Sequence, residues 1–132
     1  MQQFCFSINN YTEAIEVISV CKKLKKIPVL HIKYFIINGF GINWLKELNQ
    51  LIKLKYQSKD FKFFINSKTN YGLFINLVEY GVDYINIRSD EDTMKRLKQI
   101  AKINKVSVNP KFSIIDLKKI KRVDLKIKKI YE

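Results

Sequence analysis

The sequence is poor in the residues that interrupt or cross-link a fold, with two Pro, four Gly and two Cys among 132 residues. No low-complexity linker is present, so we predict a single domain over residues 1–132. Cys5 and Cys21 have neither a CxxC partner nor metal-ligand spacing, which argues against a disulfide framework and against a metal site. We therefore expect two buried free thiols in a reducing cytoplasm.

Long apolar runs are also missing, and none approaches the length that spans a bilayer. The first ten residues, MQQFCFSINN, lack a basic n-region and a small-residue cleavage site. We therefore expect neither a membrane partner nor a secretory signal. Apolar residues nevertheless make up 47% of the chain, which predicts a packed core rather than disorder.

Acidic residues are few, since 12 Asp and Glu stand against 25 Lys and Arg, and the formal net charge is +13. Such a charge favours an acidic partner, nucleic acid included. Only three of the basic residues are Arg, however, although Arg is the side chain that reads bases and phosphates best. The chain also has twenty Ile and only two Ala, a composition that AT-rich codons produce whatever the function. Both explanations of the charge stay open.

The apolar residues form short runs that alternate with stretches of helical periodicity. Strands are predicted at residues 4–8, 29–33, 61–65, 82–87 and 106–108, and helices at 12–26, 42–54, 71–80 and from about 90 to 103. Short connections in such an alternation indicate parallel strands joined by right-handed crossovers. We predict a flavodoxin- or Rossmann-like α/β fold: one open sheet of about five mainly parallel strands with helices on both faces. The alternative is a half (βα)8 barrel that forms a homodimer, because EYGVDYINI resembles the strand entry of a barrel enzyme.

The C-terminal segment, residues 113–132, is the most basic part of the chain. Residues 113–120 suit a short helix, and the alternation VDLKIK at 123–128 predicts a half-exposed edge strand, an antiparallel one if it pairs with the sheet. An acidic protein or nucleic acid is expected to contact its cations, which are Lys118, Lys119, Lys121, Arg122, Lys126, Lys128 and Lys129. The competing explanation is that these lysines only keep an edge strand from aggregating.

Amides and cations follow the predicted ends of the strands, where open α/β sheets bind their ligands. The candidate contacts for an anion such as phosphate or carboxylate are Asn66, Ser67, Lys68, Arg88, Ser89 and Lys111. Several of them adjoin helix starts, which favour negative charge. The alternative is that Asn and Ser simply end strands and cap helices here.

No catalytic residue, metal ligand or cofactor is expected from the sequence. His31 is the single histidine and lies inside a predicted strand, and no Ser-His-Asp or Cys-His arrangement is evident. Asp90 and its two acidic neighbours suit the first turn of a helix better than a metal site. The leading hypothesis is a non-enzymatic cytoplasmic domain that binds a small anion or a protein partner at the strand ends. An enzyme whose site is completed by dimerisation is the alternative.

The turn Asn38-Gly39-Phe40-Gly41 has the spacing GxG but no third glycine, so it does not predict a dinucleotide site. Its aromatic and aliphatic neighbours are expected to pack over the end of the sheet, with the glycines at positive φ. Trp44, in phase with Leu48 of the next helix, is expected to pack against the sheet.

Three stretches, PVLHI, NGFGINWLKELNQLI and FFINSKTNYGLFINLVEYGVDYINI, resemble a family of small uncharacterised α/β proteins from alphaproteobacteria. The resemblance covers residues 28–110 approximately, and its most specific points are Gly41, Trp44, Gly72 and Gly81. Where that family has a Pro- and Gly-rich loop and an acidic end to the third strand, this chain has YFIINGF and the sequence Asn-Ser-Lys. The resemblance therefore implies the fold and brings no activity.

Overall fold

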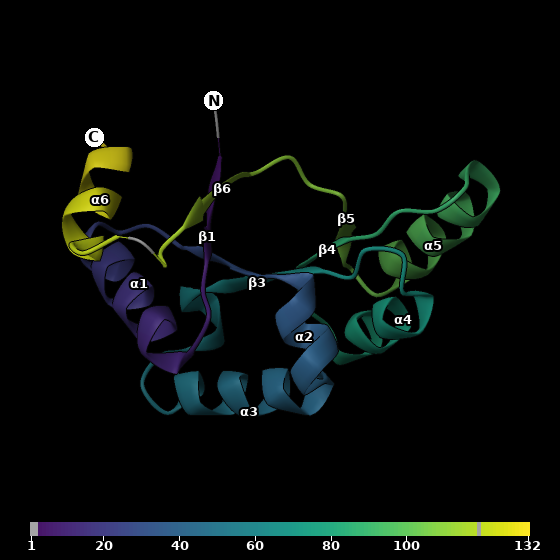
Figure 1. Ribbon diagram of the computed structural model, residues 1–132, viewed down its shortest axis with the longest axis horizontal. Helices are drawn as coiled ribbons and strands as arrows, with labels where there is room; N and C mark the ends of the chain where they lie inside the picture. Colours follow the sequence, from purple (N-terminus) through teal and green to yellow (C-terminus); the bar gives the residue numbers. More distant parts are fainter. Residues whose placement is uncertain (1–2, 119) are drawn as a thin grey trace.

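The structure is a computed structural model that describes residues 3–118 and 120–132, and it forms an open α/β sheet in which all six strands are parallel (Figure 1). The strands are β1 (Phe4–Ser7), β2 (Val29–Ile32), β3 (Lys62–Asn66), β4 (Tyr84–Asn86), β5 (Ser107–Val108) and β6 (Ser113–Asp116). Their order across the sheet is β5-β4-β3-β2-β1-β6. The predicted class, an open parallel α/β sheet of the flavodoxin- or Rossmann-like kind, is confirmed.

Six α-helices connect and follow these strands in the described residues. They are α1 (Tyr11–Lys23), α2 (Tyr34–Phe40), α3 (Ile42–Lys53), α4 (Tyr71–Tyr80), α5 (Glu91–Ile103) and α6 (Val123–Ile130), with a 3-10 turn at Ser58–Asp60. The side chains of Asn10, Asn70 and Asp90 begin α1, α4 and α5 by accepting a hydrogen bond from a first-turn amide. Gly81 ends α4 in the left-handed region, at φ 91°. None of these helices is long and apolar enough to cross a membrane.

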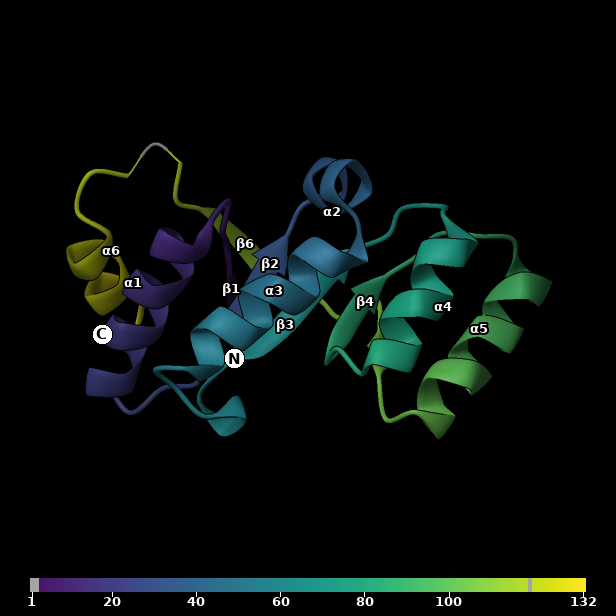
Figure 2. The same ribbon diagram turned by 90° about the horizontal axis from the view of Figure 1, so that it is seen from below.

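Contrary to the prediction from the sequence, the crossover helices do not lie on both faces of the sheet. Strands β1 to β5 are neighbours in chain order, so successive right-handed crossovers arrive on the same side of the sheet. Helices α1 to α5 accordingly lie on one face (Figures 1 and 2). A (βα)8 barrel has the same consecutive order, but here the sheet stays open and β6 returns to pair with β1.

Each face of the sheet carries its own cluster of buried apolar side chains. Under the helices lies the main core, which includes the fully buried Phe6, Leu30 and Ile65. On the other face, Phe64 is covered by Phe112, with ring centroids 5.7 Å apart. Because Phe112 belongs to the connection between β5 and β6, this connection closes over the face that carries no crossover helix (Figure 1).

The C-terminal segment folds in the reverse of the predicted order. The expected helix over 113–120 is strand β6, parallel to β1, and the expected edge strand over 123–128 is helix α6, which packs beside α1. Val123 and Ile127 are buried, whereas Leu125 is 51% exposed. Alternation would bury all three, so the four-residue spacing of Val123 and Ile127 decides for a helix.

The glycine turn is only partly as predicted. Residues 34–40 form helix α2, and Gly41 adopts φ 83° between α2 and α3, while Gly39 stays helical. Within α2, two isoleucines are buried, but Phe35 and Phe40 are 67% and 69% exposed, so the prediction that they cover the sheet is wrong. Trp44 is half-buried at the edge of the core and stacks on Phe40 at 5.9 Å.

Candidate anion-binding site

A pocket of about 320 Å³ opens at the carboxyl ends of β3, β4 and β5. Its lining consists of amide side chains, two cations and two apolar residues: Asn66, Lys68, Asn86, Ile87, Arg88, Asn109 and Pro110. Three of the six residues predicted to contact an anion, Asn66, Lys68 and Arg88, therefore lie together. This volume suits a small ligand.

The turn after β3 positions Lys68 through hydrogen bonds at three successive residues. The side-chain oxygen of Asn66 accepts from the backbone N–H of Lys68 at 3.0 Å. Ser67 donates to the carbonyl oxygen of Asn86 from both its backbone N–H, at 2.9 Å, and its hydroxyl, at 2.6 Å. Lys68 takes a left-handed conformation, φ 49°. The turn is thus fixed to the end of β4, and the buried Ser67 has a structural role.

Arg88 is held beside Lys68 by the backbone. Its N–H donates to the carbonyl oxygen of Lys68 at 2.8 Å, while its side chain is exposed. Within residues 3–118 and 120–132, the ion pairs involve Lys22, Lys33 and Arg122, so neither cation of the pocket is neutralised by a carboxylate. Both residues line the pocket, so two cations without a carboxylate partner among the described residues are its main electrostatic feature.

The asparagines of the pocket divide into two roles. Asn109 pairs with the backbone of Ile87, accepting at 2.9 Å and donating at 3.0 Å, and so holds β5 against β4. Asn66 and Asn86 are direct partners across β3 and β4. The side-chain amide of Asn86 makes no hydrogen bond with any residue that the structure describes, so it is free to contact a ligand. Sequence reasoning missed Asn86 because it lies inside a predicted strand, although its spacing from Tyr84 places both side chains on one face.

The remaining predicted contacts lie outside the pocket. The hydroxyl of Ser89 hydrogen-bonds the hydroxyl of Tyr71 at 2.8 Å and donates to the Asp90 carboxylate at 3.1 Å. Hydrogen bonds from Thr93 hold the pKa of Asp90 below its usual range, so the start of α5 carries a negative charge that disfavours an anion. Lys111 is exposed and does not line the pocket. The idea that helix starts bind the anion is therefore not supported.

Two other cavities lie at the opposite edge of the sheet, beside the amino ends of the strands. One of about 530 Å³ is lined by residues that include Val29, Lys62 and Tyr131, and one of about 220 Å³ by residues that include Asn49 and Asp83. Ligands of open parallel sheets bind at the carboxyl ends. The smaller pocket with Lys68 and Arg88 is for this reason the better candidate, although it is not the largest.

His31 lies beside Ser7, which is distant from it in the sequence. Its Nδ1 lies 3.2 Å from the hydroxyl oxygen of Ser7, its partner on β1, and its Nε2 has no partner among the described residues. Burial lowers the pKa of His31 to about 4, and Lys33 adds to the effect while Asp116 opposes it. Ser7 and His31 are both buried, so this contact belongs to the core and offers no accessible nucleophile.

The cysteines are both buried and free, as predicted. Burial raises the pKa of Cys5 and of Cys21 to about 12. No cluster of His, Cys, Asp or Glu in the described ranges could hold a metal ion.

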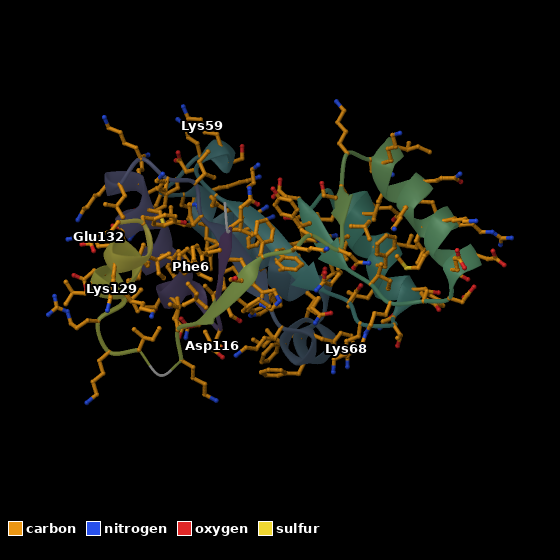
Figure 3. All side chains as sticks on the ribbon, turned by 90° about the horizontal axis from the view of Figure 1, so that it is seen from above. Phe6, Lys59, Lys68, Asp116, Lys129 and Glu132 are labelled. Carbon is orange, nitrogen blue, oxygen red and sulfur yellow. The ribbon has the colours of Figure 1, made fainter. Side chains whose placement is uncertain are left out.

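The basic C-terminal segment does not adjoin the pocket. Lys68 and Lys129 lie at separate parts of the molecule (Figure 3). The cations of the segment that the structure describes are all exposed: Lys118, Lys121, Arg122, Lys126, Lys128 and Lys129. Lys119 lies outside the described residues. Whether a partner contacts this segment stays a prediction.

No protein-family model matches the chain, and no curated protein matches it. The resemblance to the alphaproteobacterial family stays a prediction.

Proposed function

We propose that this protein binds a small anion in the pocket at the ends of β3, β4 and β5, in a binding role rather than a catalytic one. The observation that carries the proposal is that Lys68 and Arg88 line one concave site, and that neither forms an ion pair with a carboxylate of the described residues. Phosphate and carboxylate are the anions that an ammonium and a guanidinium group recognise best.

Lys68, Arg88 and Asn86 make different contacts with the anion in the proposed complex. Lys68 contributes a flexible point charge, and Arg88 contributes a planar fork that two oxygens of one anion can accept from. The free amide of Asn86 adds a neutral donor beside them. Since each charge-assisted hydrogen bond is worth about 1.5–3 kcal/mol, two such bonds correspond to roughly millimolar affinity for inorganic phosphate.

A thermal-shift titration tests the proposal, with phosphate, sugar phosphates and nucleotides compared with potassium chloride at equal ionic strength. A ligand at 100 times its Kd stabilises by about 2.7 kcal/mol, or about 10 °C in Tm for a chain of this length. The shift should disappear in Lys68→Gln/Arg88→Gln and persist in Lys126→Gln/Lys129→Gln, which removes the same charge from α6. No shift with any anion, or an equal shift in both double variants, would contradict the proposal.

A further inference from the structure

Helix α2, beside the pocket, exposes large aromatic side chains. Phe35 is 67% exposed and Phe40 is 69% exposed, although both belong to a helix that Ile36 and Ile37 fasten into the core. Phe40 is further supported from behind by its stack on Trp44. The backbone of both phenylalanines is helical and their rings are exposed to solvent, which suits a binding surface.

Two lysines lie over aromatic rings of α2. The Nζ of Lys68 lies 5.1 Å from the centroid of the Tyr34 ring, and the Nζ of Lys33 lies 5.9 Å from that of Phe35. Arg88 joins this series through its backbone hydrogen bond to Lys68. The aromatic–basic edge, as we name it, consists of Lys33, Tyr34, Phe35, Phe40, Lys68 and Arg88.

We infer that the aromatic–basic edge binds single-stranded nucleic acid, with a backbone phosphate in the pocket and unpaired bases stacked on Phe35 and Phe40. The inference rests on the proposed function, because it takes the anion in the pocket to be a phosphodiester. Proteins bind single strands by this combination of a cationic track with aromatic rings. A duplex keeps its bases stacked on one another, so it offers no base faces to the rings.

Charge complementarity favours nucleic acid over a lipid surface or a second copy of the chain. The formal net charge of +13 repels a second copy and attracts a polyanion. A lipid surface would be met by a continuous apolar face, whereas α2 exposes the polar Asn38 one turn from Phe35. At this edge Asp116 accepts a hydrogen bond from Lys33 at 2.6 Å, and Asp90 accepts hydrogen bonds from Thr93 and Ser89, so we take Lys68 and Arg88 as the principal phosphate contacts.

Fluorescence polarisation at low salt tests the inference with a labelled single-stranded oligonucleotide of about ten residues. An abasic oligomer with the same number of phosphates, and a duplex, serve as ligand controls. Phe35→Ala and Phe40→Ala should each weaken single-strand binding about fivefold or more. Leu54→Ala and Ile103→Ala, each made at a position 81% exposed, should leave it unchanged. Lys68→Gln/Arg88→Gln should reduce the slope of log affinity against log salt by about 1.4.

The outcomes separate the inference from the proposed function. A phosphate-induced thermal shift without tighter binding of the oligonucleotide than of the abasic oligomer overturns the inference and leaves the proposed function standing. Absence of both the shift and oligonucleotide binding overturns both. The inference is also overturned if oligonucleotide binding is unchanged by Phe35→Ala. The same holds if binding persists in Lys68→Gln/Arg88→Gln with an unchanged salt slope. Binding to phosphatidylserine vesicles that Phe35→Ala abolishes, with oligonucleotide binding unaffected, would likewise overturn the inference. Circular dichroism of each variant confirms that the fold is retained.

Discussion

Acidification should destabilise this protein through a single buried imidazole. His31 is 4% exposed and has a pKa of about 4 in the folded chain, against an ordinary value of 6.5. Below pH 6.5 the unfolded chain takes up a proton at this position, and the folded chain does not until the pH approaches 4. The unfolded state therefore binds more protons across this window, and the free energy of unfolding falls as the pH falls.

The size of the effect follows from the same two pKa values. Their difference corresponds to about 3 kcal/mol between neutral pH and pH 4, of which about 2 kcal/mol is already lost at pH 5. A loss of this size is a large part of the 5–15 kcal/mol that stabilises a typical domain. Carboxylates with lowered pKa values, such as Asp116, contribute mainly at lower pH, so His31 dominates the upper part of the window.

Urea unfolding at pH 7.5, 6.5, 5.5 and 5.0 measures this dependence. His31→Asn is the matched control, because its amide keeps a group that can bond the Ser7 hydroxyl and does not titrate. The variant should be nearly insensitive to pH from 7.5 to 5.0. NMR titration of the only histidine gives its pKa directly in protein without a histidine tag. A measured pKa of 6 or above, or equal pH dependence in both proteins, would refute the reasoning.

Three further predictions concern stability and reactivity. Gly81→Ala should lower the free energy of unfolding, measured in urea, by about 1 kcal/mol because φ is 91°, whereas Gly72→Ala, with only Asn70 near its new methyl group, should not; equal values for the two variants would contradict this. Ile127→Ala should cost about 2–5 kcal/mol in the same assay and Leu125→Ala less than about 1 kcal/mol; equal costs would contradict helix α6. The two cysteines should react with a thiol reagent only after denaturant is added, because both thiols are buried; rapid reaction of the native protein would contradict this.

Local structure was predictable where periodicity and end signals agree. Helix α4 begins and ends at the predicted residues, because Asn70 caps its start and Gly81 supplies the left-handed stop. Asp90 caps the start of helix α5, and acidic residues occupy its first turn, as expected from their favourable interaction with the helix dipole. These capping signals depend on residues within one turn of each other, so they can be read from a single sequence.

The C-terminal segment was not predictable because two periods coincide there. Val123 and Ile127 are consistent with a strand, in which every second residue is buried, and with a helix, in which every fourth is. The contacts of α6 decide between them, since Tyr131 packs on Phe6 and α6 lies along α1. Those partners are more than a hundred residues away in the chain, so no local window contains the information.

The candidate site depends on strand order more than on any local motif. Lys68 and Arg88 follow different strands, and their convergence requires β3 and β4 to be neighbours in the register that pairs Asn66 with Asn86. A doubly wound sheet with its helices on both faces could separate these strand ends and would place a ligand where the order reverses. The consecutive order instead places the ends of β3 and β4 side by side, so Lys68 and Arg88 line one pocket. The same order brings α2, which follows β2, beside the turn after β3, where Lys68 reaches the ring of Tyr34. The anion pocket and the aromatic–basic edge are therefore two consequences of one topology, and a variant that loses one through misfolding should lose the other as well.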